Sequence, residues 1–180
     1  MKIQLTIAGF GGQGIMLLVQ MLAYAASKKN QNSLWFPSYG PETRGGTANC
    51  AVTISDDEIH SPVFSKADAI IVFNQPSLDK FQSKVKDEGQ VFFNASTIDA
   101  SSINTKAKKY AIDANRIANE LGNIKVANMV MLGAFLAINP IFSDEEIIAM
   151  LKKVLGEKKK DLVDINISAI SLGKKAVKAE

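Results

Sequence analysis

The sequence predicts an α/β fold in which a mostly parallel, Rossmann-like sheet carries helices on both faces within a single domain. Two runs of β-branched and apolar residues, 3–8 and 69–74, are typical of buried parallel strands. The segment 15–26 changes to apolar residues at three- and four-residue steps, which predicts an amphipathic helix. The chain has 180 residues, of which 47% are hydrophobic and 22% charged, so we expect residues 1–180 to form one domain around one core.

The first half of the chain predicts a strand, a glycine-rich turn, a helix and a second strand. Strand 3–8 ends at Gly9, and the helix that follows ends at the polar segment 28–30. The next strand, 33–36, closes this unit with a right-handed crossover. Turn-forming residues then predict an exposed, shaped loop. The remaining elements expected before the midpoint are a strand at 47–55, a turn at 56–57, the strand at 69–74 and a helix at 76–84.

The second half predicts two further strands followed by helices. We expect the strands at 90–94 and 109–113. Helix 144–155 has Ser143 as its N-cap, and Pro140 separates it from the helix before it. The helices expected in this half are 114–121, 127–139, 144–155 and a basic helix at the end of the chain.

Composition excludes several functional classes. A formal net charge of +3 is too small and too dispersed to argue for nucleic acid. One cysteine, Cys50, and one histidine, His60, cannot build a disulfide, an iron–sulfur site or a structural zinc site. The start of the chain has no apolar segment of the signal-peptide or membrane-spanning kind, so we expect a cytoplasmic protein without a membrane partner.

The strongest local motif is a glycine-rich turn with G-x-G-x-x-G spacing between the first strand and the first helix. It comprises Gly9, Phe10, Gly11, Gly12, Gln13 and Gly14. Glycines allow positive φ and close backbone approach, and the free N–H groups at a helix N-terminus favour an anion. The alternative is a tight turn that needs glycine for packing alone.

A nicotinamide dinucleotide does not fit the next strand. The acidic residue that would bind the ribose hydroxyls is missing, and Trp35, Phe36 and Pro37 stand there instead. The motif therefore predicts phosphate binding without dinucleotide binding.

A second motif is the polar loop after residue 36. Arg44 is a planar donor suited to a phosphate or carboxylate, Glu42 could position it, and Ser38 and Tyr39 offer hydroxyl groups. We expect this loop and the glycine turn to face one crevice at the same sheet edge. The alternative is that Glu42 and Arg44 form an ordinary surface ion pair.

Other conspicuous residues have structural interpretations. We expect His60 to lie at the surface and Cys50 to be a small buried hydrophobe, although a thiol near a crevice can be redox-sensitive. The apolar positions of 129–136 and 151–154 predict core or subunit contacts, and an isolated chain could form a homodimer through them. No set of carboxylates, histidines or thiols in the sequence makes a complete catalyst, so we expect no catalytic residue and no metal ligand.

Taken together, these motifs resemble the gamma subunit of 2-oxoacid:ferredoxin (acceptor) oxidoreductases, and most closely the 2-oxoglutarate branch. The resemblance covers nearly the whole chain. It rests on the segments 9–14, 37–42, 44–50, 61–62 and 131–134, and on Asn166, Ala169 and Gly173 in the last helix.

The resemblance implies that residues 1–180 form a gamma-type domain of a complex that converts a 2-oxoacid and coenzyme A to acyl-coenzyme A and carbon dioxide. It also implies that alpha, beta and delta subunits are partners and that ferredoxin or flavodoxin is the electron acceptor. Thiamine diphosphate, Mg²⁺ and iron–sulfur clusters are expected on those partners, none on this chain alone, and coenzyme A is a shared ligand. The chain alone is expected to be inactive.

Matching the two motifs to this family gives a set of expected cofactor-binding residues. They are Gly9, Gly11, Gly12, Gln13, Gly14, Ser38, Tyr39, Glu42, Arg44, Gly45, Gly46 and Asn49. Two other roles remain open. The same loops could be an assembly surface without ligand contact, or the chain could be a stand-alone nucleotide-binding oxidoreductase.

Overall fold

A computed structural model gives the fold and describes residues 1–39, 46–156 and 160–179. Within these residues the strands form one seven-stranded sheet in the order β2-β3-β1-β4-β5-β6-β7. The strands are β1 (Lys2–Phe10), β2 (Asn32–Tyr39), β3 (Thr47–Ser55), β4 (Ala67–Val72), β5 (Val85–Asn94), β6 (Lys108–Ile112) and β7 (Lys178–Ala179).

The centre of the sheet is parallel, as the sequence predicts. Strand β4 pairs in parallel with β1 on one side and with β5 on the other, and β5 pairs in parallel with β6. The buried runs Leu5–Ala8 and Ala69–Val72 lie side by side there, because a strand covered on both faces needs apolar residues at every position.

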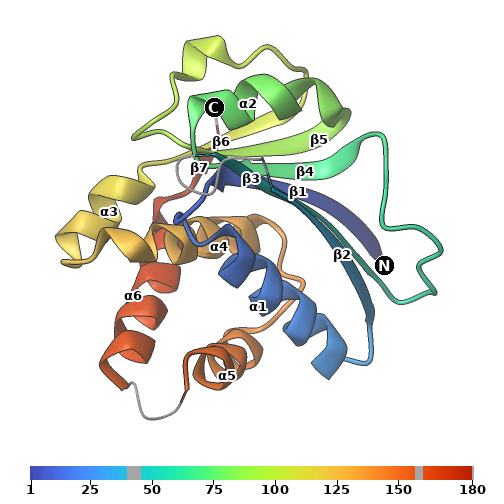
Figure 1. Ribbon diagram of the computed structural model, residues 1–180. Coiled ribbons are helices and arrows are strands. Elements are labelled where there is room, and N and C mark those ends of the chain that lie inside the picture. Colours follow the sequence, from blue (N-terminus) through green and yellow to red (C-terminus); the bar gives the residue numbers. More distant parts are fainter. Residues whose placement is uncertain (40–45, 157–159, 180) are drawn as a thin grey trace.

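Helices cover both faces of the sheet, and the predicted α/β class is confirmed. Figure 1 shows α2 on one face and the other α-helices on the opposite face. The helices are α1 (Ile15–Lys28), α2 (Gln75–Phe81), α3 (Ala114–Glu120), α4 (Ala127–Ile138), α5 (Asp144–Leu155) and α6 (Lys160–Ala176), with short 3₁₀ turns at Gln82–Lys84, Ala100–Ser102 and Ile124–Val126. The cap at Ser143 is also confirmed: Ser143 Oγ accepts from the Glu146 N–H while the Glu146 side chain accepts from the Ser143 N–H.

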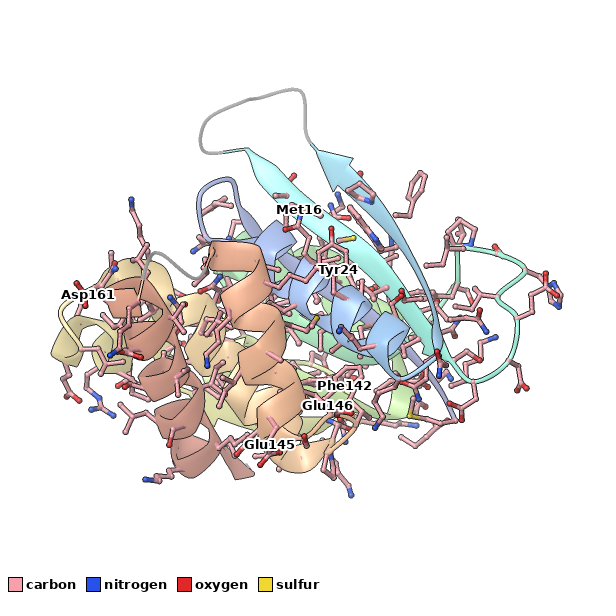
Figure 2. All side chains as sticks on the ribbon, turned by 90° about the horizontal axis from the view of Figure 1, so that it is seen from below. Met16, Tyr24, Phe142, Glu145, Glu146 and Asp161 are labelled. Carbon is pink, nitrogen blue, oxygen red and sulfur yellow. The ribbon has the colours of Figure 1, made fainter. Side chains whose placement is uncertain are left out.

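Helices α4 and α6 touch through their backbones. A Cβ built on Gly133 would overlap with the carbonyl oxygen of Ile170, and a Cβ built on Gly173 would overlap with that of Val130. Two glycines therefore set the distance between these helices. Figure 2 views the helical face of the molecule, where α5 and α6 stand in front of the sheet beside α1.

The strand order at the two edges of the sheet was not predicted from the sequence. Strand β3 is antiparallel to both β1 and β2 and lies between them, so β2 is not the neighbour of β1. The two-residue strand β7 at the other edge was also not predicted. Strand order depends on which chain segments meet in space, and the period of side chains along a strand does not encode it.

Of the two interpretations of segment 129–136, core and subunit contact, the structure confirms the core. Met129, Met131 and Phe135 on α4 are fully buried within the chain, and Leu151 of α5 is buried as well. Helix α4 is apolar on every side because the sheet, α3 and α6 surround it.

In the described part of the chain, each helix is too short or too polar to cross a membrane.

Candidate functional site

The glycine turn lies at the carboxyl end of β1, where α1 begins. Gly12 has φ +93° and Gly14, the N-cap of α1, has φ +74°, so both adopt a backbone conformation that favours glycine. Gly14 offers no side-chain cap to the first turn of α1. Among the described residues, the N–H groups of Gly12 and Gly14 have no backbone acceptor and can serve an external anion.

The side chain of Gln13 fastens the turn to the sheet. Its Oε1 accepts a hydrogen bond from the Phe10 N–H at 2.6 Å and another from Asn74 Nδ2 at 3.1 Å. The other amide atom of Asn74, Oδ1, accepts from the Ser77 N–H and caps α2. The side-chain oxygen of Gln13 thus has a structural role, and the expected ligand contact of this residue stays a prediction.

Close packing also requires glycine at positions 9 and 14 of the turn. A Cβ on Gly9 would lie 2.6 Å from Gln13 Oε1, and a Cβ on Gly14 would overlap with the amide of Asn128. Asn128 is 2% exposed and donates from Nδ2 to the Gly14 carbonyl at 3.1 Å. Gly11 and Gly12 are exposed, and an added Cβ there meets open space.

The turn borders the crevice between the carboxyl ends of β1 and β4, where the following helices leave to opposite faces of the sheet. After β1 the chain continues into α1 on one face, and after the neighbouring β4 it continues into α2 on the other. Ligands of open α/β sheets bind at this kind of position. A cavity of about 130 Å³ lies here, lined by Gly12, Gln13, Phe73, Asn115, Ile124, Lys125 and Ala127.

Lys125 supplies the positive charge of this cavity. The nearby Arg116 is already neutralised, since its guanidinium contacts Asp113 at 2.8 Å and Glu120 at 2.7 Å. The Ser96 hydroxyl, followed by Arg116, holds the pKa of Asp113 below its usual range, so this carboxylate is charged at neutral pH. Within residues 1–39, 46–156 and 160–179, Lys125 forms no ion pair and can balance a bound anion.

The start of β3 meets the glycine turn, as the sequence predicts. The Gly11 N–H donates to the carbonyl of Gly46 at 3.1 Å, and the Tyr39 backbone pairs with Ala48. The ends of β2 and β3 therefore lie at the same edge as the turn. Three further expected site residues, Glu42, Arg44 and Gly45, lie outside the described residues.

The predicted single crevice was wrong for the side chains of Ser38 and Asn49. These residues pair across β2 and β3, and both line a groove of about 310 Å³ together with Phe81 of α2. Cys50, the next residue of β3, packs on the other face with α1. Successive side chains of a strand point to opposite faces, which places Ser38 and Asn49 across the sheet from α1.

Cys50 and His60 occupy the predicted positions. Burial raises the pKa of the Cys50 thiol to about 12, so the thiol is uncharged at neutral pH. His60 is exposed in the loop between β3 and β4. In the parts of the chain that the structure describes, His, Cys, Asp and Glu do not gather in groups of three that could hold a metal ion.

Four residues that shape the crevice were missed by the sequence interpretation: Asn74, Asn115, Asn128 and Lys125. Asn74 and Asn115 follow closely on the strands β4 and β6, and this position was an available signal. Nothing in the sequence marks Asn128, since its partner lies 114 residues earlier in the chain.

Comparison with known proteins identifies the family. The family model described as pyruvate ferredoxin/flavodoxin oxidoreductase matches residues 4–176. The chain belongs to this family. The gamma-type resemblance is also confirmed, because the gamma subunit of a keto/oxoacid ferredoxin oxidoreductase from Geobacter sulfurreducens has the same fold, with a TM-score of 0.81 and 27% identity over 97% of both chains.

Curated relatives in this family have different substrates in their names. The ketoisovalerate oxidoreductase subunit VorA of Methanothermobacter marburgensis is 36% identical over 96% of this chain, and the chain spans 36% of that relative's length. The 2-oxoglutarate synthase subunit KorC of Methanocaldococcus jannaschii is 34% identical over 99% of this chain and 95% of its own. The names of these two relatives thus give two different substrates within the family.

Proposed function

We propose that this chain is the gamma-type subunit of a multi-subunit 2-oxoacid:ferredoxin or flavodoxin oxidoreductase and that its glycine turn binds a phosphate group of coenzyme A. The observation that carries the ligand role is the crevice at the carboxyl ends of β1 and β4. There Gly12, whose N–H group has no backbone acceptor among the described residues, and Lys125 border one small cavity.

The size of the cavity limits what it holds. At about 130 Å³ it is below the 300–1,000 Å³ that is typical of sites for whole small molecules, so it suits a phosphate group and not an entire nucleotide. Backbone N–H groups and a lysine are an established combination for phosphate. The remainder of coenzyme A would extend over neighbouring subunits.

The reaction chemistry belongs to groups that we place on partner subunits. Thiamine diphosphate would supply the stabilised carbanion there, and iron–sulfur clusters would carry the released electrons to the acceptor. Residues of this chain bind and orient: Gly12 and Lys125 hold the anion, and Gln13 keeps the turn in place. We propose 2-oxoglutarate as the substrate because a KorC subunit matches this chain over 95% of its own length. The cytoplasmic location stays a prediction.

The test is a kinetic comparison in the assembled complex. Lys125→Ala should raise the Michaelis constant for coenzyme A several-fold and leave that for the 2-oxoacid unchanged, because Lys125 meets only the anion in this proposal. Arg44→Ala is the corresponding variant of the polar loop. Lys152→Ala removes a lysine from the last turn of α5, which does not line this cavity, and is the matched control.

Dephospho-coenzyme A and pantetheine, used in place of coenzyme A, identify the phosphate that is bound. If the wild type and Lys125→Ala differ equally for all three thiols, or do not differ at all, the phosphate role is wrong. Family membership would be unaffected by that result.

A second candidate role, assembly without ligand contact, is favoured by the groove on the opposite sheet face. Helix α2 leaves the β2–β3 end of that face uncovered, and the groove there is bordered by Phe36 and Val63, which are 54% and 67% exposed. Apolar side chains exposed in this way are typical of protein interfaces. Under this alternative, Phe36→Ser and Arg44→Ala would lower the yield of co-purified subunits and leave the kinetics of the surviving complex intact.

A stand-alone nucleotide-binding oxidoreductase is disfavoured by strand order. A dinucleotide-binding sheet brings the end of the second strand beside the glycine turn, where an acidic residue binds the ribose. Here β3 separates β2 from β1. Retention of the isolated chain on a nicotinamide affinity resin would contradict this conclusion.

A further inference from the structure

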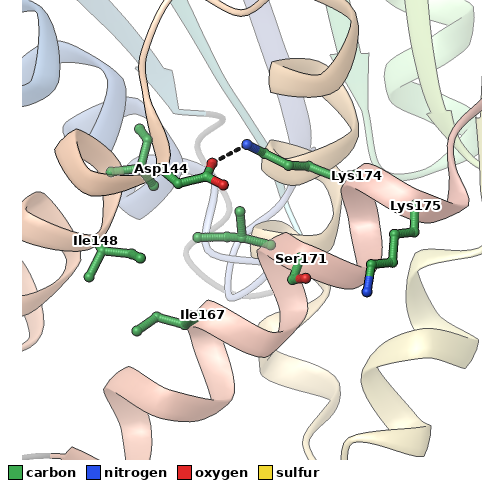
Figure 3. A pocket seen from close by; sticks show the side chains of 8 residues that line it. Asp144, Ile148, Ile167, Ser171, Lys174 and Lys175 are labelled. Carbon is green, nitrogen blue, oxygen red and sulfur yellow. Dashed lines mark hydrogen bonds and ion pairs between the residues drawn. The ribbon is translucent and has the colours of Figure 1, made fainter.

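A second cavity lies between α5 and α6, outside the glycine crevice. It has a volume of about 370 Å³ and combines four isoleucines with four polar residues (Figure 3). Its residues recur at helical spacing on each side: Asp144, Ile147 and Ile148 on α5, and Ile167, Ser171 and Lys175 among those on α6. One face of each helix therefore borders the cavity.

The walls of this α5–α6 groove are apolar and open to solvent. Ile147 and Ile170 are 1% and 6% exposed and form its floor, whereas Ile148 and Ile167 are partly exposed at its sides. Burying this isoleucine surface under an aliphatic ligand would be favourable by about 25 cal/mol per Å² of apolar area.

One end of the groove is polar and carries an available positive charge. Lys174 is paired with Asp144, but Lys175 forms no ion pair with the described residues. The Ser171 hydroxyl is similarly available: Ser168, on the same helix, donates to the Asp164 carbonyl, whereas Ser171 makes no hydrogen bond with the described part of the chain. Ser171 and Lys175 are four residues apart on α6 and can contact one group.

We propose that this groove binds a short aliphatic monocarboxylate, with its chain along the isoleucines and its carboxylate on Lys175 and Ser171. The volume lies near the lower limit for small-molecule sites, which selects a short chain. Since Lys174 is paired with Asp144, Lys175 is the lining cation that has no ion pair with the described residues, and one available positive charge favours a singly charged head group over a phosphate. This site does not depend on the function proposed for the glycine crevice.

The experiment follows isoleucine δ-methyl signals of the full chain by NMR during titration with hexanoate. Hexanoate should shift the methyl signals of Ile148 and Ile167, and leave that of Ile71, buried in β4, unchanged. Hexanol, which has the same chain without the charge, should bind about tenfold more weakly, since a charge-assisted hydrogen bond contributes at least about 1.4 kcal/mol.

Two variants separate the head group from the chain. Lys175→Gln should weaken hexanoate binding about tenfold and leave hexanol binding unchanged. Lys152→Gln removes an equivalent charge from α5 outside the groove and should change neither. Equal binding of hexanoate and hexanol, equal effects of the two variants, or no shift at millimolar hexanoate would each overturn the proposal.

Discussion

The side-chain amide of Asn74 donates a hydrogen bond to the side-chain oxygen of Gln13 across 3.1 Å, and this bond connects the carboxyl ends of two parallel strands. Gln13 belongs to the turn after β1, and Asn74 caps the helix after β4. The two helices leave to opposite faces of the sheet at this point. The bond therefore holds together the two sides of the candidate phosphate crevice.

Replacing Gln13 should loosen the crevice. Gln13→Ala leaves the Phe10 N–H and the nearly buried Asn74 amide without their acceptor, so the free energy of unfolding should fall by about 1–3 kcal/mol. Gln13→Glu retains an acceptor oxygen and should preserve most of this stability while weakening anion binding through its charge. Urea denaturation measures the first effect and coenzyme A titration the second. A Gln13→Ala protein as stable as the wild type would contradict the structural role of this side chain.

The two positive-φ glycines of the turn should respond differently to alanine. Gly12→Ala places its methyl group in open space and should cost about 1–2 kcal/mol for the left-handed backbone alone. Gly14→Ala adds an overlap with Asn128 to the same strain and should be clearly more destabilising. Thermal unfolding of the two variants compares them directly. Equal losses would show that the overlap with Asn128 is relieved at no cost.

The contact between α4 and α6 should not tolerate a methyl group. Gly133→Ala and Gly173→Ala would each force the helix backbones apart, with an expected loss of about 1–3 kcal/mol or more. Ser168→Ala, on the exposed side of α6, is the control and should stay within about 0.5 kcal/mol of the wild type. Chemical denaturation followed by circular dichroism measures all three. Normal stability of both glycine variants would refute the close crossing.

Cys50 should be unreactive in the folded chain. Burial raises the pKa of its thiol to about 12, and the thiolate is the reactive form. Iodoacetamide at pH 8 should therefore label Cys50 only after denaturation. Rapid labelling of the native protein would contradict this burial.

The same pKa shift makes stability depend on pH. The pKa of the Cys50 thiol is higher in the folded chain than in the unfolded chain, where it is about 8.5. Its contribution to stability is therefore fully present below that unfolded pKa and is lost as the pH rises towards 12. Stability should thus fall more steeply above pH 9 in the wild type than in Cys50→Ala. Parallel unfolding curves for the two proteins at alkaline pH would contradict the shift.

The sequence predicts most individual elements because their signals are local. The apolar runs in β1 and β4, the spacing of α1 and the Ser143 cap each depend on neighbouring residues, and the structure confirms them. The candidate site was predicted in part. The glycine turn has its own motif, whereas Lys125 and Asn128 reach the crevice from a distant segment with no local signal.

By itself, the sequence determined the α/β class, the glycine turn with its free N–H groups and the family, because alternation, helical spacing and motif order are properties of the chain. The tertiary structure decided the rest. It placed β3 between β1 and β2, and it put Ser38 and Asn49 on the sheet face opposite α1. It also brought Lys125 beside Gly12 and placed Ser171 and Lys175 at one end of a groove. These relationships depend on which surfaces pack together, since packing minimises exposed apolar area over the whole chain and not within any one segment.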